Sequence, residues 1–220
     1  GPFGRKLMEE MRKVTGIRTL AVSENGYRHF VTSEKQIKSV ADMKGLKIRT
    51  MENPAHMKMV EALGAAPTPV AFGELYMALQ QGVVDGCELP MTLTNNGKYY
   101  EVQKHTILDG HLYNPLIMFV NDKVWGKLTE DQKAALYEGA QLFNIAQRAI
   151  SERQVQSGIL NVTEKGMTVY VPTPAQLNEF RSVSQPPVLE YVKAQAGEQW
   201  VKEALEAVAA AEAKMADMLK

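Results

Sequence analysis

The sequence predicts an α/β fold in which short strands alternate with helices around a parallel sheet. The first observation is the order of elements within residues 44–90, where extended runs at 47–49, 67–70 and 83–86 are separated by helical segments. The second is the helical spacing of the apolar residues in those segments. Strands separated by helices of this length favour a parallel sheet with helices packed on its faces.

The breaks between these elements have local causes. Asn53-Pro54 ends the first strand, because proline fixes its own φ and biases the preceding residue away from helix. A helix then runs from about residue 55 to 63, and Gly64 suits the left-handed position just after it. After the extended run at 67–70, a second helix covers about 73–81, followed by the short buried strand at 83–86.

Apolar periodicity and Gly, Pro and Asn breaks predict the remaining elements. In chain order they are a helix at 5–14 ended by Gly16, a strand at 19–22, a tight turn at Asn25-Gly26, a strand at 28–32, a helix or loop at 92–99, an irregular or extended stretch at 102–111, a strand at 112–120 covered on both faces, a helix at about 129–166, a strand at 167–171, a helix from about 175 interrupted by Pro186-Pro187, and a helix at 198–220.

The helix at about 129–166 is the longest predicted element. Thr129 is its expected N-cap and Gln132 the capping-box partner. If it is continuous, its length of about 55 Å at roughly 1.5 Å per residue exceeds the width of one small domain. We therefore expect it to span two domains.

Composition excludes several classes of function. Lys+Arg and Asp+Glu balance at 25 each, so the charge does not predict a nucleic-acid partner. No apolar run is long enough to span a membrane. The single Cys87 cannot form an internal disulfide, and the four histidines lack metal-type spacing. No nucleophile elbow, phosphate loop or dinucleotide fingerprint is present, so we expect no catalytic residue, no cofactor and no metal.

Arg49 is the main candidate for ligand binding. It ends the strand at 47–49, and ligands of parallel sheets bind at the carboxyl ends of the strands. Its guanidinium offers a planar fork of donors that matches a carboxylate bidentately. The sequence therefore predicts that a carboxylate binds at this edge of the sheet.

Several stretches together resemble the substrate-binding proteins of tripartite ATP-independent periplasmic (TRAP) transporters, the DctP-type family. They are residues 25–28, 37–44, GLKIRT at 45–50, LGAAPTPVAFGELYMALQQGVVDGCE at 63–88, 100–104 and 110–113. Their order and spacing extend the resemblance along nearly the whole chain. The resemblance implies a two-lobed periplasmic-binding-protein fold with a long helix spanning both lobes.

The resemblance also implies further ligand-binding residues. A second ligand-facing arginine is expected at Arg28, for which the alternative is a surface or structural role. Phe72 lies where the family places a pocket-lining aromatic. Met51, in the turn after Arg49, either lines the pocket or packs on the lobe surface. Asn53 and Glu88 belong to the same predicted set.

Leu89 completes the set and marks a departure from the family. Where members commonly carry Gln-Glu-Asn-Pro, this chain has Cys87-Glu88-Leu89-Pro90. The hypothesis is that an apolar side chain here favours a monocarboxylate with an apolar or aromatic body over a dicarboxylate or a sugar acid, whose extra polar groups would be buried unpaired. The alternative is that Leu89 points into the core of the lobe.

The function implied by the resemblance is that of a periplasmic solute-binding protein, which captures a small organic acid and delivers it to TRAP membrane permease subunits. An enzyme or a sensory ligand-binding module on a similar two-lobed scaffold is the alternative. The resemblance further implies a carboxyl-terminal fragment with an incomplete first lobe. Residues 1–18 and 114–153 would be the remnant of that lobe, 19–113 and 154–190 the second lobe, and 191–220 a carboxyl-terminal helix.

Overall fold

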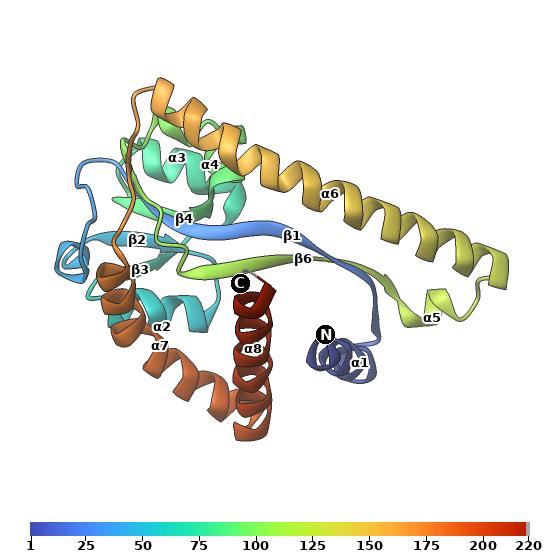
Figure 1. Cartoon of the computed structure of the whole chain (residues 1–220). Helices are drawn as coiled ribbons and strands as arrows, with labels where there is room; N and C mark the ends of the chain where they lie inside the picture. Colours follow the sequence, from blue (N-terminus) through green and yellow to red (C-terminus); the bar gives the residue numbers. More distant parts are fainter. Residues whose placement is uncertain (219–220) are drawn as a thin grey trace. The chain divides into compact units, whose positions relative to one another are not determined.

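The computed structural model describes residues 1–218 and confirms the α/β class (Figure 1). Its helices are α1 (Pro2–Thr15), α2 (Pro54–Ala62), α3 (Leu75–Gln80), α4 (Met91–Asn96), α5 (Asp122–Trp125), α6 (Glu130–Glu164), α7 (Pro174–Ala196) and α8 (Glu198–Met218). Its strands are β1 (Ile17–Thr32), β2 (Lys47–Thr50), β3 (Ala66–Pro69), β4 (Gly86–Pro90), β5 (His105–Ile107), β6 (Leu112–Asn121) and β7 (Thr168–Tyr170). Short 3₁₀ helices lie at Val40–Met43, Phe72–Glu74 and Tyr99–Glu101. Within the described residues, no helix has the length and apolar character needed to cross a membrane.

The chain divides into two compact units. Unit 1 comprises Gly1–Ser23, Leu116–Gln147 and the chain from Leu189 onward, and unit 2 comprises Glu24–Pro115 and Arg148–Val188. Four elements, β1, β6, α6 and α7, contribute residues to both units. α6 is one continuous helix of 35 residues, which meets the condition set for it to span two domains.

The strands form one mixed sheet in the order β3-β2-β4-β1-β5-β7, with β6 paired to β1. β2 is parallel to both β3 and β4, as the alternation of strands and helices predicts, and β5 is parallel to β7. β1 is antiparallel to β4 and β5. The parallel arrangement expected for residues 44–90 is therefore confirmed at β2, β3 and β4. β1 precedes the first helical crossover of the sheet, so its direction is not fixed by one.

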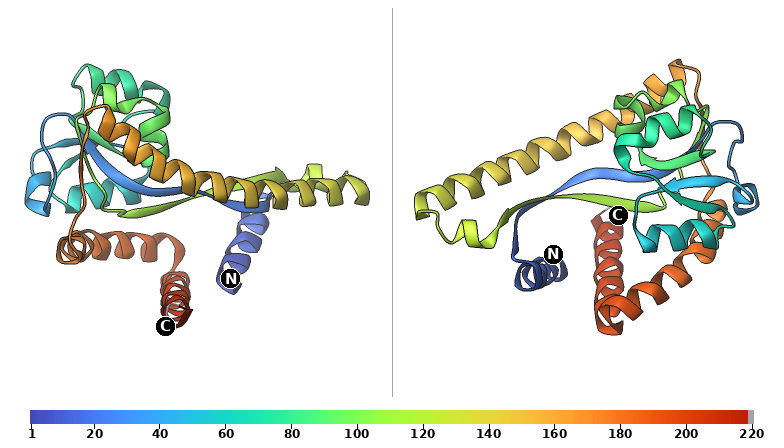
Figure 2. Two further views of the ribbon diagram at one scale, coloured as in Figure 1. Left: turned by 45° about the horizontal axis from the view of Figure 1, so that its top comes forward. Right: turned by 180° about the vertical axis from the view of Figure 1, so that it is seen from behind.

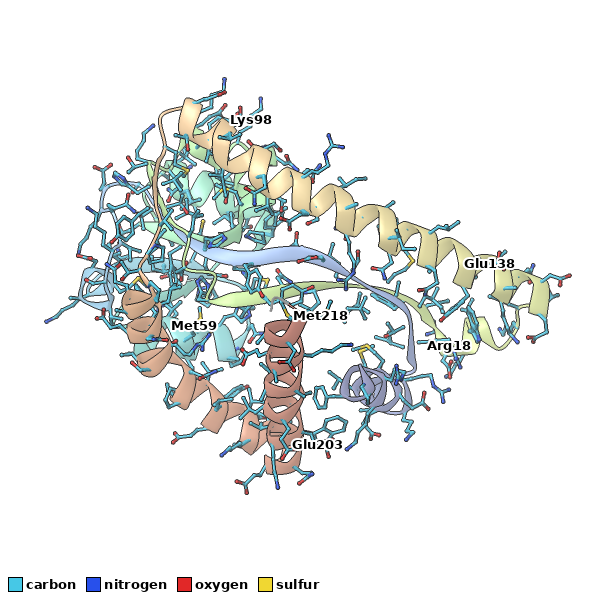
Figure 3. All side chains as sticks on the ribbon, viewed as in Figure 1. Arg18, Met59, Lys98, Glu138, Glu203 and Met218 are labelled. Atoms are coloured by element: carbon cyan, nitrogen blue, oxygen red, sulfur yellow. The ribbon has the colours of Figure 1, made fainter. Side chains whose placement is uncertain are left out.

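Two core clusters cover the two faces of the sheet in unit 2. The first core cluster contains Val31, Leu75, Ala78, Leu79, Val84, Cys87, Leu89, Met91, Tyr99, Val162 and Met167. The second contains Phe30, Ile37, Met43, Ile48, Met59, Val60, Leu63, Ala65, Ile107 and Phe180. Helices α3 and α4 and the end of α6 pack on the first, and α2 and the start of α7 on the second (Figure 2). Met59 of α2 points toward the sheet (Figure 3).

Unit 1 has a smaller core. Leu20, Ala21 and Ala140 are buried together, with Met118, Val120 and Trp125 packed around them. Lys6 of α1 pairs with Glu203 of α8 at 2.6 Å, and Phe3 meets Trp200 edge to face. Phe119 of β6 is 60% exposed, and Leu116 and Ile117 are also exposed. The prediction that this strand is covered on both faces is therefore wrong for the described residues.

Three local predictions are also wrong. No tight turn forms at Asn25-Gly26, because the flanking segments do not pair with each other; both belong to β1, whose partners are β4, β5 and β6. The strand expected at 83–86 begins at Gly86, and Val83 is half exposed. Pro186 and Pro187 lie inside α7 rather than interrupting it. Each proline removes one N–H bond and crowds the carbonyl four residues earlier, but burial of Phe180 in the second core cluster stabilises the preceding turns.

The predicted cap of the long helix is confirmed. The Thr129 hydroxyl accepts from the Gln132 backbone N–H at 3.2 Å, and the Gln132 side chain accepts from the Thr129 N–H at 2.9 Å. Reciprocal bonds of this kind satisfy two donors that have no partner within the helix.

Candidate functional site

The polar residues of the site gather at one edge of the unit 2 sheet. The parallel strands β2, β3 and β4 all end there, at Thr50, Pro69 and Pro90. β1 runs the opposite way, and its Arg28 lies opposite Pro90. The carboxyl edge of an α/β sheet is the usual location of a ligand site, and this topology brings two arginines to it.

Arg49 is a buried cation with an incomplete set of partners. The residue is 1% exposed, and its Nε donates to the Val70 carbonyl at 2.8 Å. Nη1 is buried without a hydrogen-bond partner among the described residues. Burial lowers the pKa of Arg49, because the charged form loses its hydration. The terminal nitrogens of the guanidinium can thus hold an anion, which would supply the missing bonds.

Arg28 is held by a buried carboxylate. Its Nε and Nη2 both bind the Glu88 carboxylate, the latter at 2.8 Å, and Nη2 also donates to the Glu88 carbonyl at 2.6 Å. Nη1 donates to the Asn114 side chain at 2.8 Å. A guanidinium has five N–H groups, so these four bonds leave Arg28 one donor for a ligand.

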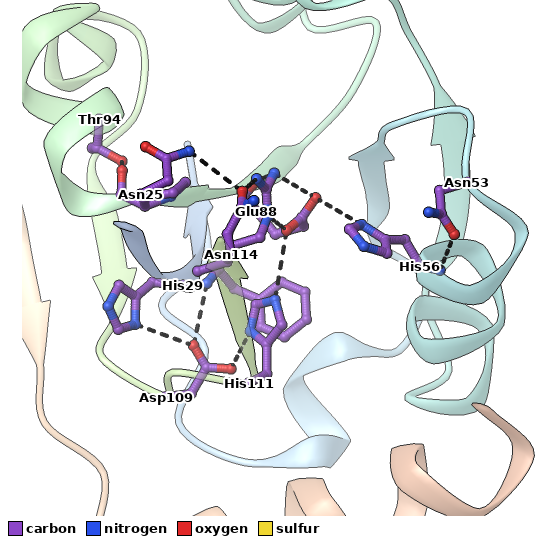
Figure 4. Close-up of polar contacts among 12 residues, drawn as sticks. Asn25, His29, Asn53, His56, Glu88, Thr94, Asp109, His111 and Asn114 are labelled. Carbon is purple, nitrogen blue, oxygen red and sulfur yellow. Dashed lines mark hydrogen bonds and ion pairs between the residues drawn. The ribbon is translucent and has the colours of Figure 1, made fainter. Parts of the chain in front are cut away.

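Glu88 is the centre of a larger charged network (Figure 4). Its side chain is fully buried, and three basic residues surround it. His56 Nδ1 lies 3.7 Å from Glu88 Oε1, and His111 Nε2 lies 3.7 Å from Glu88 Oε2. Burial alone would raise the pKa of Glu88, but these neighbours together hold the pKa below its usual range.

His111 lies between two carboxylates. Its Nδ1 is 2.6 Å from Asp109 Oδ2, and its ring stacks on Phe30 with a centroid distance of 4.2 Å. Burial alone would lower the pKa of His111, whereas Asp109 and Glu88 raise the pKa to about 9. His111 is therefore an imidazolium near neutral pH, and Asp109 is its buried counter-ion.

His29 accepts a hydrogen bond rather than competing for Asp109. Its Nδ1 accepts from the Gly110 N–H at 3.0 Å, so this nitrogen carries a lone pair. The distance of 3.8 Å from Nδ1 to Asp109 Oδ1 is too long for a hydrogen bond. Oδ1 instead accepts from the Phe30 backbone N–H at 3.3 Å.

The other predicted site residues occupy three kinds of position. Phe72 is 55% exposed, two residues beyond Val70, whose carbonyl holds Arg49. Met51 is partly buried in the loop after β2. Asn53 is the N-cap of α2 and accepts from the Ala55 and His56 backbone N–H groups.

Leu89 is 1% exposed and belongs to the first core cluster, as its alternative interpretation expects. Strand alternation points its side chain away from the face of the sheet that carries Glu88. Its packing among core residues gives no support to a ligand contact.

Sequence reasoning missed Asp109, His111 and His56. His56 and His111 were considered only as metal ligands, and in the described residues no cluster of His, Cys, Asp and Glu is arranged to hold a metal ion. A signal was nevertheless present. Asp109-Gly110-His111 follows the extended stretch that forms β5, and polar residues directly after a strand gather at the same edge as Arg49.

Comparison with known proteins places the chain among binding proteins. The family model described as bacterial extracellular solute-binding protein, family 7 (DctP) matches residues 1–195. A solute-binding protein of Verminephrobacter eiseniae is 36% identical over 212 residues, covering 96% of this chain and 61% of that protein. The sialic acid-binding periplasmic protein SiaP of Vibrio cholerae is 31% identical, covering 86% of this chain and 58% of that protein.

Similarity to solved structures also places the chain among solute-binding proteins. A TRAP periplasmic solute binding protein from Ochrobactrum anthropi superposes with a TM-score of 0.87 at 33% identity, covering 100% of this chain and 68% of that one. Another, from Polaromonas sp. JS666 and bound to D-erythronate, gives a TM-score of 0.84 at 36% identity, with coverages of 92% and 66%. The chain thus spans less than two thirds of the length of the curated relatives just described.

Proposed function

Because this chain belongs to family 7 of the bacterial extracellular solute-binding proteins, we propose that it is the ligand-binding part of a periplasmic protein that captures a small organic acid for a TRAP-type permease. The observation that carries the proposal is the buried guanidinium of Arg49 with its unpaired Nη1. A buried cation without a full set of hydrogen bonds is costly, and a carboxylate would remove that cost.

In this proposal the two arginines have different roles in binding the ligand. Arg49 binds the ligand carboxylate bidentately through its terminal nitrogens, since its Nε is committed to Val70. Arg28 adds its one remaining N–H and its charge, while Glu88 and Asn114 fix its orientation. Phe72, which is exposed beside this edge, contacts the body of the ligand, and Met51 flanks it.

A hydroxylated monocarboxylic acid is the first ligand class to test. The Polaromonas relative was bound to D-erythronate, and a relative from Chromohalobacter salexigens was bound to D-glucuronate. The competing hypothesis of an apolar ligand body depends on Leu89 facing the ligand, and Leu89 packs in the core.

An enzymatic role has no observation in its favour. Burial raises the pKa of the Cys87 thiol to about 12, so this residue is not a thiolate nucleophile near neutral pH. Glu88, Arg28, His111 and Asp109 are engaged with one another in ion pairs, and Arg49 is a cation with a free donor, which suits binding of an anion rather than proton transfer.

Two measurements test the proposal. Mass spectrometry of small molecules released from the purified protein by denaturation would identify a co-purified acid. Calorimetry with D-erythronate, D-glucuronate, succinate and benzoate would then rank the ligand classes, with erythritol as the control that lacks a carboxylate. We expect saturable binding of at least one acid and none of the control; absence of binding by every acid would contradict the proposal.

A further inference from the structure

We propose that Asp109 is a positioning residue of the acid-binding site: it keeps His111 doubly protonated, so that His111 shares the charge of Glu88 and Arg28 retains positive potential toward the ligand. This inference rests on the proposed function. It concerns residues that sequence reasoning left out of the site.

Negative and positive charges alternate along a buried series of four side chains. Asp109, His111, Glu88 and Arg28 follow one another, and their side chains are at most 5% exposed. The contacts are 2.6 Å from Asp109 Oδ2 to His111 Nδ1 and 3.7 Å from His111 Nε2 to Glu88 Oε2, followed by the bidentate pair of Glu88 with Arg28. With His111 charged, the two anions and two cations balance.

Neither neutral form of His111 fits between the two carboxylates. A neutral ring protonated on Nδ1 would turn the Nε2 lone pair toward Glu88. A ring protonated on Nε2 would turn the Nδ1 lone pair toward Asp109 at 2.6 Å. Only the imidazolium presents an N–H to both carboxylates, and this agrees with the raised pKa of His111.

His111 and its partners have further charged or titratable neighbours. The charged or titratable side chains around His111 and its partners are Asp109, Glu88, His29, His56, Arg28 and Arg49. His29 Nδ1 accepts from the Gly110 N–H and lies 3.8 Å from Asp109 Oδ1, much farther than His111 Nδ1 lies from Asp109 Oδ2. His56 lies beside Glu88 and has no contact with Asp109 in the described structure. His111 is therefore the basic side chain through which Asp109 can act on Glu88.

The charge on His111 affects the electrostatic potential at Arg28. A carboxylate that faces Arg28 alone would largely cancel its charge, whereas Glu88 also faces the cation His111. Asp109 lies one residue farther along the chain of contacts, so its own charge opposes ligand binding less than the His111 charge favours it. Removing the Asp109 charge should weaken acid binding only at a pH where His111 then becomes neutral.

Asp109→Asn tests this, because asparagine keeps the oxygen that accepts the Phe30 N–H. Calorimetry would use the full chain at pH 6 and pH 8, with D-erythronate as the probe, or with another acid of the panel if that binds more tightly. We expect the variant to bind about tenfold more weakly than the native chain at pH 8 and within about twofold of it at pH 6. Asp42→Asn, which alters a partly exposed carboxylate of the Ser39 capping box, should bind like the native chain at both pH values.

Two outcomes would overturn the inference. One is an equal loss of affinity at pH 6 and pH 8, which would indicate that Asp109 only maintains the local structure. The other is no loss at pH 8.

NMR of histidine labelled with ¹³C supplies a readout that does not depend on ligand or on the variant folding. The His111 signal, assigned as the one missing in His111→Gln, should titrate with a midpoint near pH 9 in the native chain and at lower pH in Asp109→Asn. A neutral His111 at pH 7 in the native chain would contradict the inference even if acid binding is confirmed. Conversely, failure to bind any acid with His111 charged would contradict the proposed function alone.

Discussion

Arg49 and Glu88 show how single residues define the site. Each is a fully buried charge, and desolvation of such a group is expensive unless it is paired. Glu88 is paired on several sides, whereas the Arg49 guanidinium has one hydrogen bond among the described residues, to Val70. In the proposed function, this difference between a satisfied anion and a partly satisfied cation is what would make this edge select for acids.

The substitution Arg49→Lys tests the bidentate role. An ammonium group cannot form two parallel bonds to one carboxylate, so the affinity for an acid should fall by about 2–5 kcal/mol. Calorimetry would measure this loss, with Arg181→Lys on the exposed surface of α7 as the matched control. Near-native affinity in Arg49→Lys would remove Arg49 from the anchor position.

His111 makes the stability of the fold depend on pH. Its pKa is raised from an ordinary value of 6.5 to about 9, so its stabilising contribution is fully present below about pH 6.5 and is lost as the pH rises through about 9. We expect the melting temperature of the native chain to fall between pH 7 and pH 9.5, and His111→Gln to lack most of that fall. Equal pH dependence in both proteins would contradict a charged His111.

Strand-end position was enough to predict the edge where Arg49 and Arg28 lie. It could not predict that Glu88 binds Arg28, because the pair forms across two antiparallel strands that are 60 residues apart in sequence. The same limit hid Asp109 and His111. Their role in the site depends on the contact of His111 with Glu88 on another strand, and sequence spacing does not predict that contact.

At the scale of elements, Asn53 at the start of α2 has two possible roles. Asn53 was predicted to bind ligand, but its side-chain oxygen caps α2. Asn53→Ala should therefore lower the free energy of unfolding by about 1 kcal/mol and leave acid affinity unchanged, while Asn53→Ser should retain stability. Chemical denaturation and calorimetry would measure the two effects, and lost affinity with unchanged stability would favour the ligand role.

Elements that depend on local signals were predicted well, and elements that depend on distant partners were not. The Gly64 and Gly16 helix ends, the Thr129 cap and the parallel β2–β4 unit follow from the sequence nearby. The turn expected at Asn25-Gly26 does not form, because β1 finds its partners in strands more than 50 residues farther along the chain. Local propensity cannot report such pairings.

At the scale of the whole molecule, unit 1 has a small core and several exposed large apolar side chains. Phe119 of β6 and Leu142 and Ile145 of α6 are each at least 60% exposed. Exposed large apolar side chains favour association where they gather into a patch.

We expect the 220-residue chain, made alone, to self-associate or to form a swapped oligomer. Size-exclusion chromatography with light scattering would measure its mass, and Leu142→Glu together with Ile145→Lys should reduce the association. A monodisperse monomer with a cooperative melt would contradict this expectation.

The central claim is that a ligand carboxylate binds bidentately to Arg49. A crystal structure of the protein with its tightest-binding acid tests it most directly. We predict that two carboxylate oxygens lie within hydrogen-bond distance of Arg49 Nη1 and Nη2, with a single further bond from Arg28 Nη1. A bound acid whose carboxylate lies away from Arg49, with Nη1 still unpaired, would contradict the account.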